Sequence, residues 1–193
     1  MIIATLKAQK EAKNPKTYIL GAHYDGVDNP AANDNASGTA TMMEITKQLS
    51  KKKLNHNIQF MAFGAEEAWM VGSTKYVESL SKQQKDDIAG MINFDMVGVG
   101  DSLGIFTSYP ESKQHLTDAF VQKAKEMKLK YERGTLMASD QVPFEDAGIP
   151  TALIFYQTDK NYHTDNDTID KIQKEDLQNS LNITLDVLGN LTK

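Results

Sequence analysis

The sequence predicts a single α/β domain with a mixed, mostly parallel central sheet and helices on both of its faces. Apolar, β-rich runs alternate with helical patterns along the chain, which is typical of parallel sheets covered by helices. The length of 193 residues fits one domain with a substantial core. Because no repeat, low-complexity tract or linker divides the chain, residues 1–193 are assigned to one domain.

Six runs are predicted as strands because they are short, apolar and rich in β-formers. In chain order they span residues 2–8, 16–22, 57–64, 89–99, 103–109 and 151–156. The segment QKEAKNPK, which joins the first two, is too short for a helical crossover. These two strands are therefore expected to form an antiparallel hairpin at one edge of the sheet.

Helical patterns lie between and after these strands. They span residues 36–53, 66–81, 111–128, 141–147 and 174–191. In an open α/β sheet, binding sites form beyond the carboxyl ends of the strands. Polar residues that follow strands are therefore the first place to look for chemistry.

Composition excludes several classes of function. The formal net charge is −5, and Lys51, Lys52 and Lys53 fall at a predicted helix C-terminus, where cations are favoured, so no nucleic-acid partner is expected. Absence of cysteine excludes disulfides and thiolate metal sites. No apolar run approaches the roughly 18 residues that span a bilayer, and the N-terminal residues lack the pattern of a signal peptide, so no membrane partner is expected. A strand pattern from Ile2 onward leads us to expect that the chain begins inside a longer protein.

Metal-ligand residue types follow three of the predicted strands and lie near the end of another. His23 and Asp25 follow the second strand, Glu66 and Glu67 the third, and His163 the last, while Asp95 lies late in the fourth. The loop after His23 also contains Asp34. A nitrogen and oxygen donor set with two imidazoles suits zinc, with manganese or cobalt as substitutes. Five ligands exceed what one catalytic zinc commonly uses, so two metals about 3.5 to 4 Å apart, bridged by one carboxylate, account for the set better.

Each candidate also has a simpler interpretation. Glu66 and Glu67 could complement a helix dipole, although side chains that diverge by about 100° on a first helical turn could also divide the roles of ligand and base. Asp95 could cap a turn or pair with a lysine, but a carboxylate in an apolar strand is costly to bury without a partner. His163 could be an exposed loop residue. Two further histidines, His56 and His115, are assigned to the surface.

The sequence lacks the motifs that are typical of several other metal-binding and catalytic classes. The aspartates of the loop after His23 do not follow the spacing of an EF-hand, and Asp28 is expected to face solvent. The sequence contains no G-x-S-x-G elbow, P-loop or H-E-x-x-H pattern.

Five ordered motifs together resemble the co-catalytic dizinc aminopeptidases of metallopeptidase family 28. They are GAHYDGV, NDNASG, GAEEAWMVGS, NFDMVG and YHTDNDT, with eleven residues from His23 to Asp34. The resemblance implies the fold of zinc-dependent exopeptidases and two zinc ions per chain. One zinc would be bound by His23 and Asp95, the other by Glu67 and His163, and Asp34 would bridge them.

The same resemblance implies the remaining roles. Glu66 would be the general base, Asp25 would orient the imidazole of His23, and Tyr162 would help stabilise the oxyanion. The substrates would be peptides with a free N-terminus. Side-chain preference is assigned to apolar loop residues, namely Met137, Phe144 and Tyr156.

Two departures from the family pattern stand out. Gln141 occupies a position where histidine is common, and altered substrate contacts are expected there. The helices that usually precede the first strand in the family are absent from this chain, so exposed apolar surface and oligomerisation are expected. A secreted or cell-envelope location for the parent protein follows only from the resemblance.

Two alternative functions remain open at this point. One is a single-zinc acyltransferase of the glutaminyl cyclase type. The other is a catalytically impaired, truncated peptidase domain that acts as a binding or structural module.

Overall fold

A computed structural model describes residues 1–9 and 11–191 of the chain. Within these residues one sheet has seven strands, in the spatial order β1-β3-β2-β4-β7-β5-β6. Neighbouring strands are parallel except for β1 with β3 and β5 with β7, which are antiparallel. The predicted mixed, mostly parallel sheet is thus confirmed. The strands are β1 (Ile2–Leu6), β2 (Thr17–His23), β3 (Asn57–Phe63), β4 (Ile88–Phe94), β5 (Leu103–Thr107), β6 (Tyr131–Thr135) and β7 (Thr151–Tyr156).

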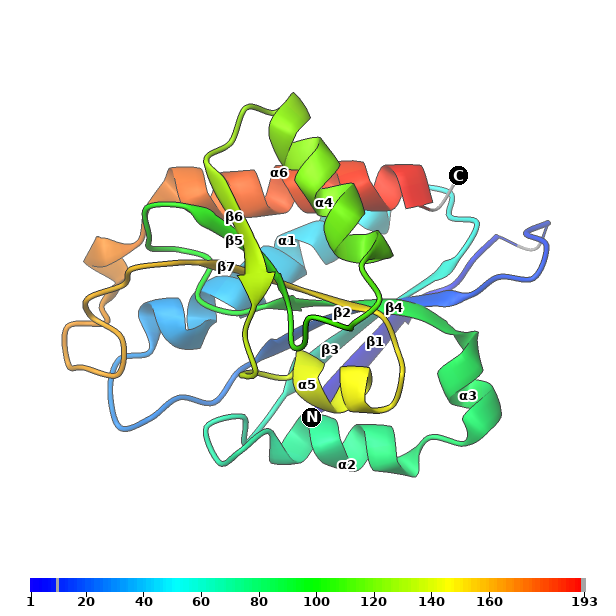
Figure 1. Ribbon diagram of the computed structural model, residues 1–193, viewed down its shortest axis with the longest axis horizontal. Helices are drawn as coiled ribbons and strands as arrows, with labels where there is room; N and C mark the ends of the chain where they lie inside the picture. The colour runs from blue at the N-terminus through cyan, green and yellow to red at the C-terminus, as the bar shows by residue number, and fades with distance from the viewer. Residues whose placement is uncertain (10, 192–193) are drawn as a thin grey trace.

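Helices cover both faces of this sheet (Figure 1). One face carries α1 (Gly38–Leu49), α4 (His115–Glu126) and α6 (Lys174–Leu191), and the other carries α2 (Val71–Ser79) and α5 (Gln141–Asp146). A short helix α3 (Lys82–Asp87) leads into β4, and the irregular turns η1 (Ala32–Ser37) and η2 (Ile169–Lys171) lie in loops. Among the described residues, none of these helices has the length and apolar content needed to cross a membrane.

The core is split by the sheet into two layers, because successive side chains of a strand point to opposite faces. Leu20 of β2 packs with Ile45 of α1 on one face. Its neighbour Ile19 packs with Phe63 of β3 and Phe144 of α5 on the other. Both layers are closely packed around β2 and β4, and these central strands end at the candidate site.

The predicted β1–β2 hairpin is wrong. β1 pairs with β3, with Ile2 opposite Ala62, and β2 lies between β3 and β4. β2 is almost entirely buried, so it takes a central position with a partner on each side, whereas β1 is largely exposed and occupies the edge. The connection runs past the start of β3, where the backbone N–H of Ala8 donates to Asn57 Oδ1 at 3.1 Å.

Local backbone geometry changes two predicted boundaries. The helix expected over residues 66–81 begins only at Val71, because Ala65, Trp69 and Met70 have positive φ angles of 60°, 67° and 56°. A right-handed helix cannot include such residues, so Glu66 and Glu67 lie in a loop instead of on a first helical turn. The strand expected over residues 89–99 ends at Phe94, which places Asp95 just beyond the strand.

Two elements were not predicted. β6 has the polar sequence YERGT and forms the exposed edge of the sheet, so it carries no apolar alternation. Helix α3 has no buried residue, but it begins with a capping box in which Ser81 and Gln84 exchange side-chain and backbone hydrogen bonds. This S-x-x-Q pattern was the signal that could have revealed the helix.

Candidate metal centre

His23 is the last residue of β2, and its side chain is only 1% exposed. Its Nδ1 lies 3.0 Å from the backbone oxygen of Asp25. Because a carbonyl oxygen can only accept, Nδ1 carries a proton, and Nε2 is the nitrogen whose lone pair can bind a metal ion once it is deprotonated. That Nε2 lies 3.1 Å from Asp34 Oδ1 and 3.3 Å from Asp95 Oδ1.

Asp34 lies in the η1 turn, which backbone and side-chain hydrogen bonds attach to the loop after β4. The Asn35 amide donates to Phe94 O at 2.8 Å and accepts from the Met96 N–H at 3.3 Å. Ser37 Oγ accepts from the Val97 N–H at 3.0 Å. This local NDNAS sequence therefore holds Asp34 beside Asp95, although the two lie 61 positions apart in the chain.

The two oxygens of Asp34 face two different imidazoles. While Oδ1 faces His23, Oδ2 lies 3.1 Å from Nε2 of His163. The same His163 Nε2 lies 3.2 Å from Glu67 Oε2. Three possible ligand groups result: His23–Asp34–Asp95 and Asp34–Glu67–His163, which share the carboxylate of Asp34, and His23–Glu66–Glu67. All five predicted ligands thus lie together at the carboxyl edge of the sheet.

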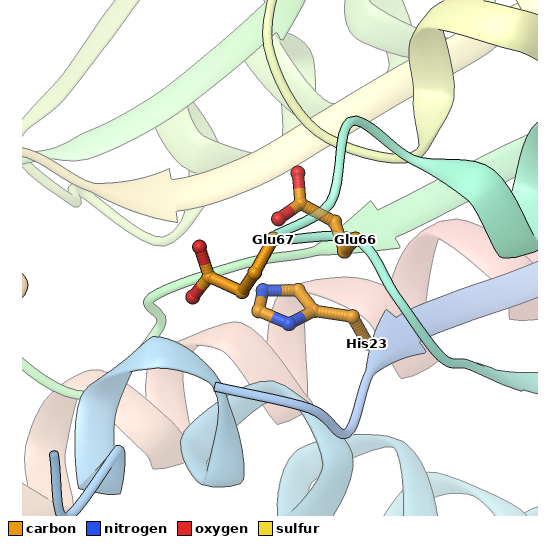
Figure 2. A group of neighbouring side chains, drawn as sticks. All are labelled: His23, Glu66 and Glu67. Carbon is orange, nitrogen blue, oxygen red and sulfur yellow. The ribbon is translucent and has the colours of Figure 1, made fainter. Parts of the chain in front are cut away.

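Glu66 and Glu67 project from the loop between β3 and α2, and Figure 2 shows their carboxylates pointing in different directions beside the His23 ring. Asp25 fixes this loop, since its Oδ1 and Oδ2 accept from the N–H groups of Glu66 and Glu67, each at 3.2 Å. Its carboxylate is 3.8 Å from His23 Nδ1, so the backbone oxygen of Asp25 makes the orienting hydrogen bond. Asp25 thus positions both the imidazole and the glutamate pair.

Crowded carboxylates shift the protonation of this cluster. Burial, followed by the charge of Asp95, raises the pKa of Glu66 to about 8. Burial also raises the pKa of Asp34 and of Glu67 above the ordinary carboxyl range. Burial by itself would lower the pKa of His23, but hydrogen bonds to Asp34 and Asp95 outweigh it and raise the pKa to about 12.

The donor set fits divalent metal ions. Among the described residues, the ion pairs that reach Asp34, Glu67 and Asp95 come from histidines and from no lysine or arginine. Glu67 Oε1 is buried without a hydrogen-bond partner in the described part of the chain. Buried carboxylates require a cation, and an imidazole and carboxylate donor set suits zinc.

A cavity of about 410 Å³ opens on this cluster. It is lined by Asp34, Glu66, Glu67 and Asp95 on one side and by Leu153, Phe155 and Tyr156 on another. Tyr162 also lines it and stacks on His163, with ring centroids 3.8 Å apart. Burial and the nearby carboxylates raise the pKa of Tyr162 to about 12, so its hydroxyl stays protonated and can donate a hydrogen bond.

The residues predicted to set side-chain preference have different positions. Tyr156 lines the cavity, as expected. Phe144 does not, because it is fully buried against Phe63 and Tyr76 in the core, which corrects its assignment. Met137 is 68% exposed in a loop whose neighbours Leu136 and Ala138 do line the cavity.

Gln141 is completely buried and is not among the residues that line the cavity, so an effect on substrate contacts would have to be indirect. His115 is exposed, as predicted. His56 is half-buried instead, where its Nδ1 accepts from the Lys16 N–H at 3.0 Å and its ring packs edge-on against Tyr18. Its role is structural.

Sequence reasoning missed the role of Asp167. This residue is 1% exposed, and its carboxylate oxygens accept from the N–H groups of Asn33 at 2.7 Å and Asp34 at 3.0 Å. It thereby fixes the backbone of Asp34. The sequence offered only the tract TDNDT, in which Asp165 and Asp167 look equivalent, and Asp165 is exposed.

Comparison with known proteins gives a consistent result. A sequence model of peptidase family M28 matches residues 1–188. Aminopeptidase YwaD of Bacillus subtilis (strain 168) is 34% identical over 188 residues, which cover 91% of this chain and 41% of that protein.

Solved structures agree in fold. An aminopeptidase from Aneurinibacillus sp. strain AM-1 has a TM-score of 0.91 and 35% identity, over 98% of this chain and 47% of its own. BSAP, a zinc aminopeptidase from Bacillus subtilis, has a TM-score of 0.90 and 31% identity, over 99% of this chain and 49% of its own. The chain thus spans less than half the length of these relatives. The match over nearly the whole chain confirms the resemblance seen in the five motifs, and the chain belongs to peptidase family M28.

Proposed function

We propose that this chain is the catalytic part of a zinc-dependent aminopeptidase, which hydrolyses the first peptide bond of substrates with a free N-terminus. The observation that carries the proposal is the shared carboxylate of Asp34, whose two oxygens face His23 at 3.1 Å and His163 at 3.1 Å. A single-metal site has no need for a carboxylate placed between two separate ligand groups. Similarity to zinc aminopeptidases supports the same conclusion.

Two zinc ions would be held by the two ligand groups, one by His23 and Asp95 and the other by Glu67 and His163, with Asp34 between them. When bound, zinc supplies Lewis acidity that polarises a carbonyl and lowers the pKa of water. The residues of the chain determine where that chemistry occurs, because they form one side of the 410 Å³ cavity.

Glu66 is the proposed general base. It lines the cavity, and although it forms a third possible ligand group with His23 and Glu67, it is in neither of the groups that share Asp34. From there its carboxylate would take a proton from the attacking water and return it to the leaving amine. Tyr162 would donate a hydrogen bond to the oxyanion that forms at the carbonyl oxygen when water adds to the carbonyl carbon.

The charge and shape of the cavity support peptides with a free N-terminus as the substrates. Its carboxylates, with no lysine or arginine among the lining residues, suit a positively charged N-terminal amine. Its apolar wall of Leu153, Phe155 and Tyr156 suits an apolar first side chain. The volume of about 410 Å³ lies in the range of small-molecule pockets.

The test combines metal content with activity. We expect about two zinc ions per chain at saturation and hydrolysis of leucine p-nitroanilide. Glu66→Gln should keep both zinc ions and lower kcat by roughly 10² to 10⁴ because it removes only the base. Asp34→Ala should instead lose zinc because it removes the bridge.

Several outcomes would contradict the proposal. A single zinc per chain would favour the glutaminyl cyclase-type alternative, as would cyclisation of an N-terminal glutamine peptide. Equal activity in wild type and Glu66→Gln would remove Glu66 as the base. Full zinc content without turnover of any aminoacyl anilide would favour the binding-module alternative.

A further inference from the structure

The loop between β6 and α5, residues 136–140, forms one wall of the cavity. Leu136, Ala138 and Ser139 line it together with the metal-site carboxylates. Its first part has little packing, since Leu136 is 39% exposed, Met137 is 68% exposed, and the preceding strand β6 lies at the exposed sheet edge, whereas Ser139 and Asp140 are buried. Besides the Leu136 N–H, which donates to Thr107 O at 2.8 Å, hydrogen bonds to the carbonyls of the loop hold this exposed part in place.

Gln141 provides those hydrogen bonds from below the loop. Its Nε2 donates to the backbone oxygen of Leu136 at 3.2 Å and to that of Ala138. Because backbone carbonyls only accept, the amide has one possible orientation, and its Oε1 faces away from the loop. Each of the two N–H hydrogens of this nitrogen thus has a carbonyl partner in the cavity wall.

The opposite end of the amide meets β4. Gln141 Oε1 accepts from Asn93 Nδ2 at 3.1 Å, and the same Nδ2 donates to Ser139 Oγ at 2.7 Å. Asn93 is 1% exposed and lies on β4, two residues before Asp95. A chain of buried amides therefore connects the strand that delivers a metal ligand to the loop that shapes the cavity.

We propose that Gln141 is a positioning residue that sets the shape of the pocket for the N-terminal side chain of the substrate, through the backbone of Leu136 and Ala138 and without touching substrate. This inference rests on the aminopeptidase function proposed above. It assigns a role to a completely buried residue that the metal chemistry does not use.

The chemistry of the amide makes the role specific to glutamine. A neutral imidazole at this position has one N–H and one lone pair, so it can accept from Asn93 and donate to one carbonyl only. Gln141→His therefore releases one carbonyl of the wall. Gln141→Met keeps a similar volume and releases both carbonyls, while Asn93 loses one of its two acceptors and keeps Ser139 Oγ.

The experiment compares the zinc-loaded wild type with Gln141→His and Gln141→Met. Hydrogen exchange of the amides of residues 137–139 should quicken about threefold or more in both variants, since a restraint on a poorly packed loop is lost. Steady-state kinetics on alanine, leucine and phenylalanine p-nitroanilides should show the phenylalanine-to-alanine ratio of kcat/KM changing by about fivefold or more, mainly through KM. Zinc content should stay unchanged.

A matched control is Thr184→Val in α6. Thr184 is completely buried, and its hydroxyl donates to Ser180 O at 2.7 Å, away from the site. This variant also loses a buried hydrogen bond, and it should leave both loop exchange and the selectivity ratio unchanged. Circular dichroism checks that each variant is folded, and if Gln141→Met does not fold, Gln141→His carries the test.

Three results would overturn the inference: unchanged exchange at residues 137–139 in folded Gln141→His, an equal loss of kcat/KM on all three substrates, or the same selectivity change in Thr184→Val. Failure of the proposed function is distinguishable. In that case wild type hydrolyses none of the anilides, whereas faster exchange in Gln141→His would still establish that Gln141 holds the loop.

Discussion

At the residue scale, position within the fold separates carboxylates that look alike in the sequence. Asp34 lies between two imidazoles, Asp25 accepts from the backbone of Glu66 and Glu67, and Asp167 accepts from the backbone of Asp34. Only the first of these can bridge two metal ions. The other two act by fixing backbone, which is how residues around a metal site orient its ligands.

The raised pKa values of the site predict that the stability of the metal-free protein depends on pH. Folding raises the pKa of Glu66 to about 8 and of His23 to about 12, from ordinary values of 4.5 and 6.5. Between about pH 6.5 and 8 the folded chain keeps protons that the unfolded chain releases, so stability falls as pH rises. Zinc binding has the opposite dependence because its ligands must be deprotonated.

Thermal unfolding, measured at pH 6.5 and at pH 8 with chelator and again with excess zinc, tests this pH dependence of stability. We expect the metal-free Tm to fall by about 3 °C or more across this window and the stabilisation by zinc to increase. In Glu66→Gln the metal-free Tm should depend less on pH, because this variant lacks one of the groups that keep a proton in the folded chain. If Tm changed with pH in the same way with and without zinc, that result would contradict the assignment of these ligands.

At the scale of elements, the site depends on loops that hold one another. The η1 turn, which carries Asp34, contacts the loop after β4 through Asn35 and Ser37 and the segment before η2 through Asp167. The loop after β3 is held by Asp25 from the loop after β2. Hydrogen bonds between the loops therefore hold the candidate ligands of separate loops next to one another.

Asp167→Asn tests this coupling. In this variant an NH₂ group, which cannot accept a hydrogen bond, replaces one of the two accepting carboxylate oxygens. One buried N–H of Asn33 or Asp34 is then left unpaired, which should cost about 1 to 3 kcal/mol of stability. We expect zinc affinity to fall about 10- to 100-fold, as for other residues that orient metal ligands. Asp165→Asn, two positions away and exposed, is the control and should change neither quantity. Urea denaturation and zinc titration against a chelating dye measure the two effects.

At the scale of the whole molecule, apolar surface remains exposed at one edge of the sheet. β1 is the edge strand, with Ile2 67% and Ile3 43% exposed, and Met43 of α1 is 69% exposed. An exposed apolar edge strand is a template for self-association.

We expect the isolated chain to self-associate through β1 as its concentration increases. Replacing Ile2 and Ile3 together by lysine should reduce the association, because edge charges disfavour strand pairing. Analytical ultracentrifugation of both proteins measures the effect, and zinc content serves as the check that the site is intact. A wild-type chain that stays monomeric at high concentration would contradict this prediction.

Much of the fold and of the site could be predicted from the sequence, because both depend on local patterns. Apolar periodicity reports burial, so it identified the central strands and helix α6 over residues 174–191. It could not identify β6, whose polar residues lie at an exposed edge, or the partner of β1, which follows from competition among strands for the centre of the sheet. Glu66 and Glu67 were placed on a helix because left-handed residues such as Trp69 are not readable from residue type.

What the sequence determined by itself is the α/β class and the set of metal-binding residue types, because strand ends in such a sheet meet at one edge. Tertiary structure alone decided that Asp34 faces both imidazoles, that Asp167 fixes its backbone, and that Gln141 lies beneath the cavity wall. Asp34 and Asp167 lie 133 positions apart in the chain. Contacts over such separations depend on how the loops pack against one another, and no local pattern of residues records that packing.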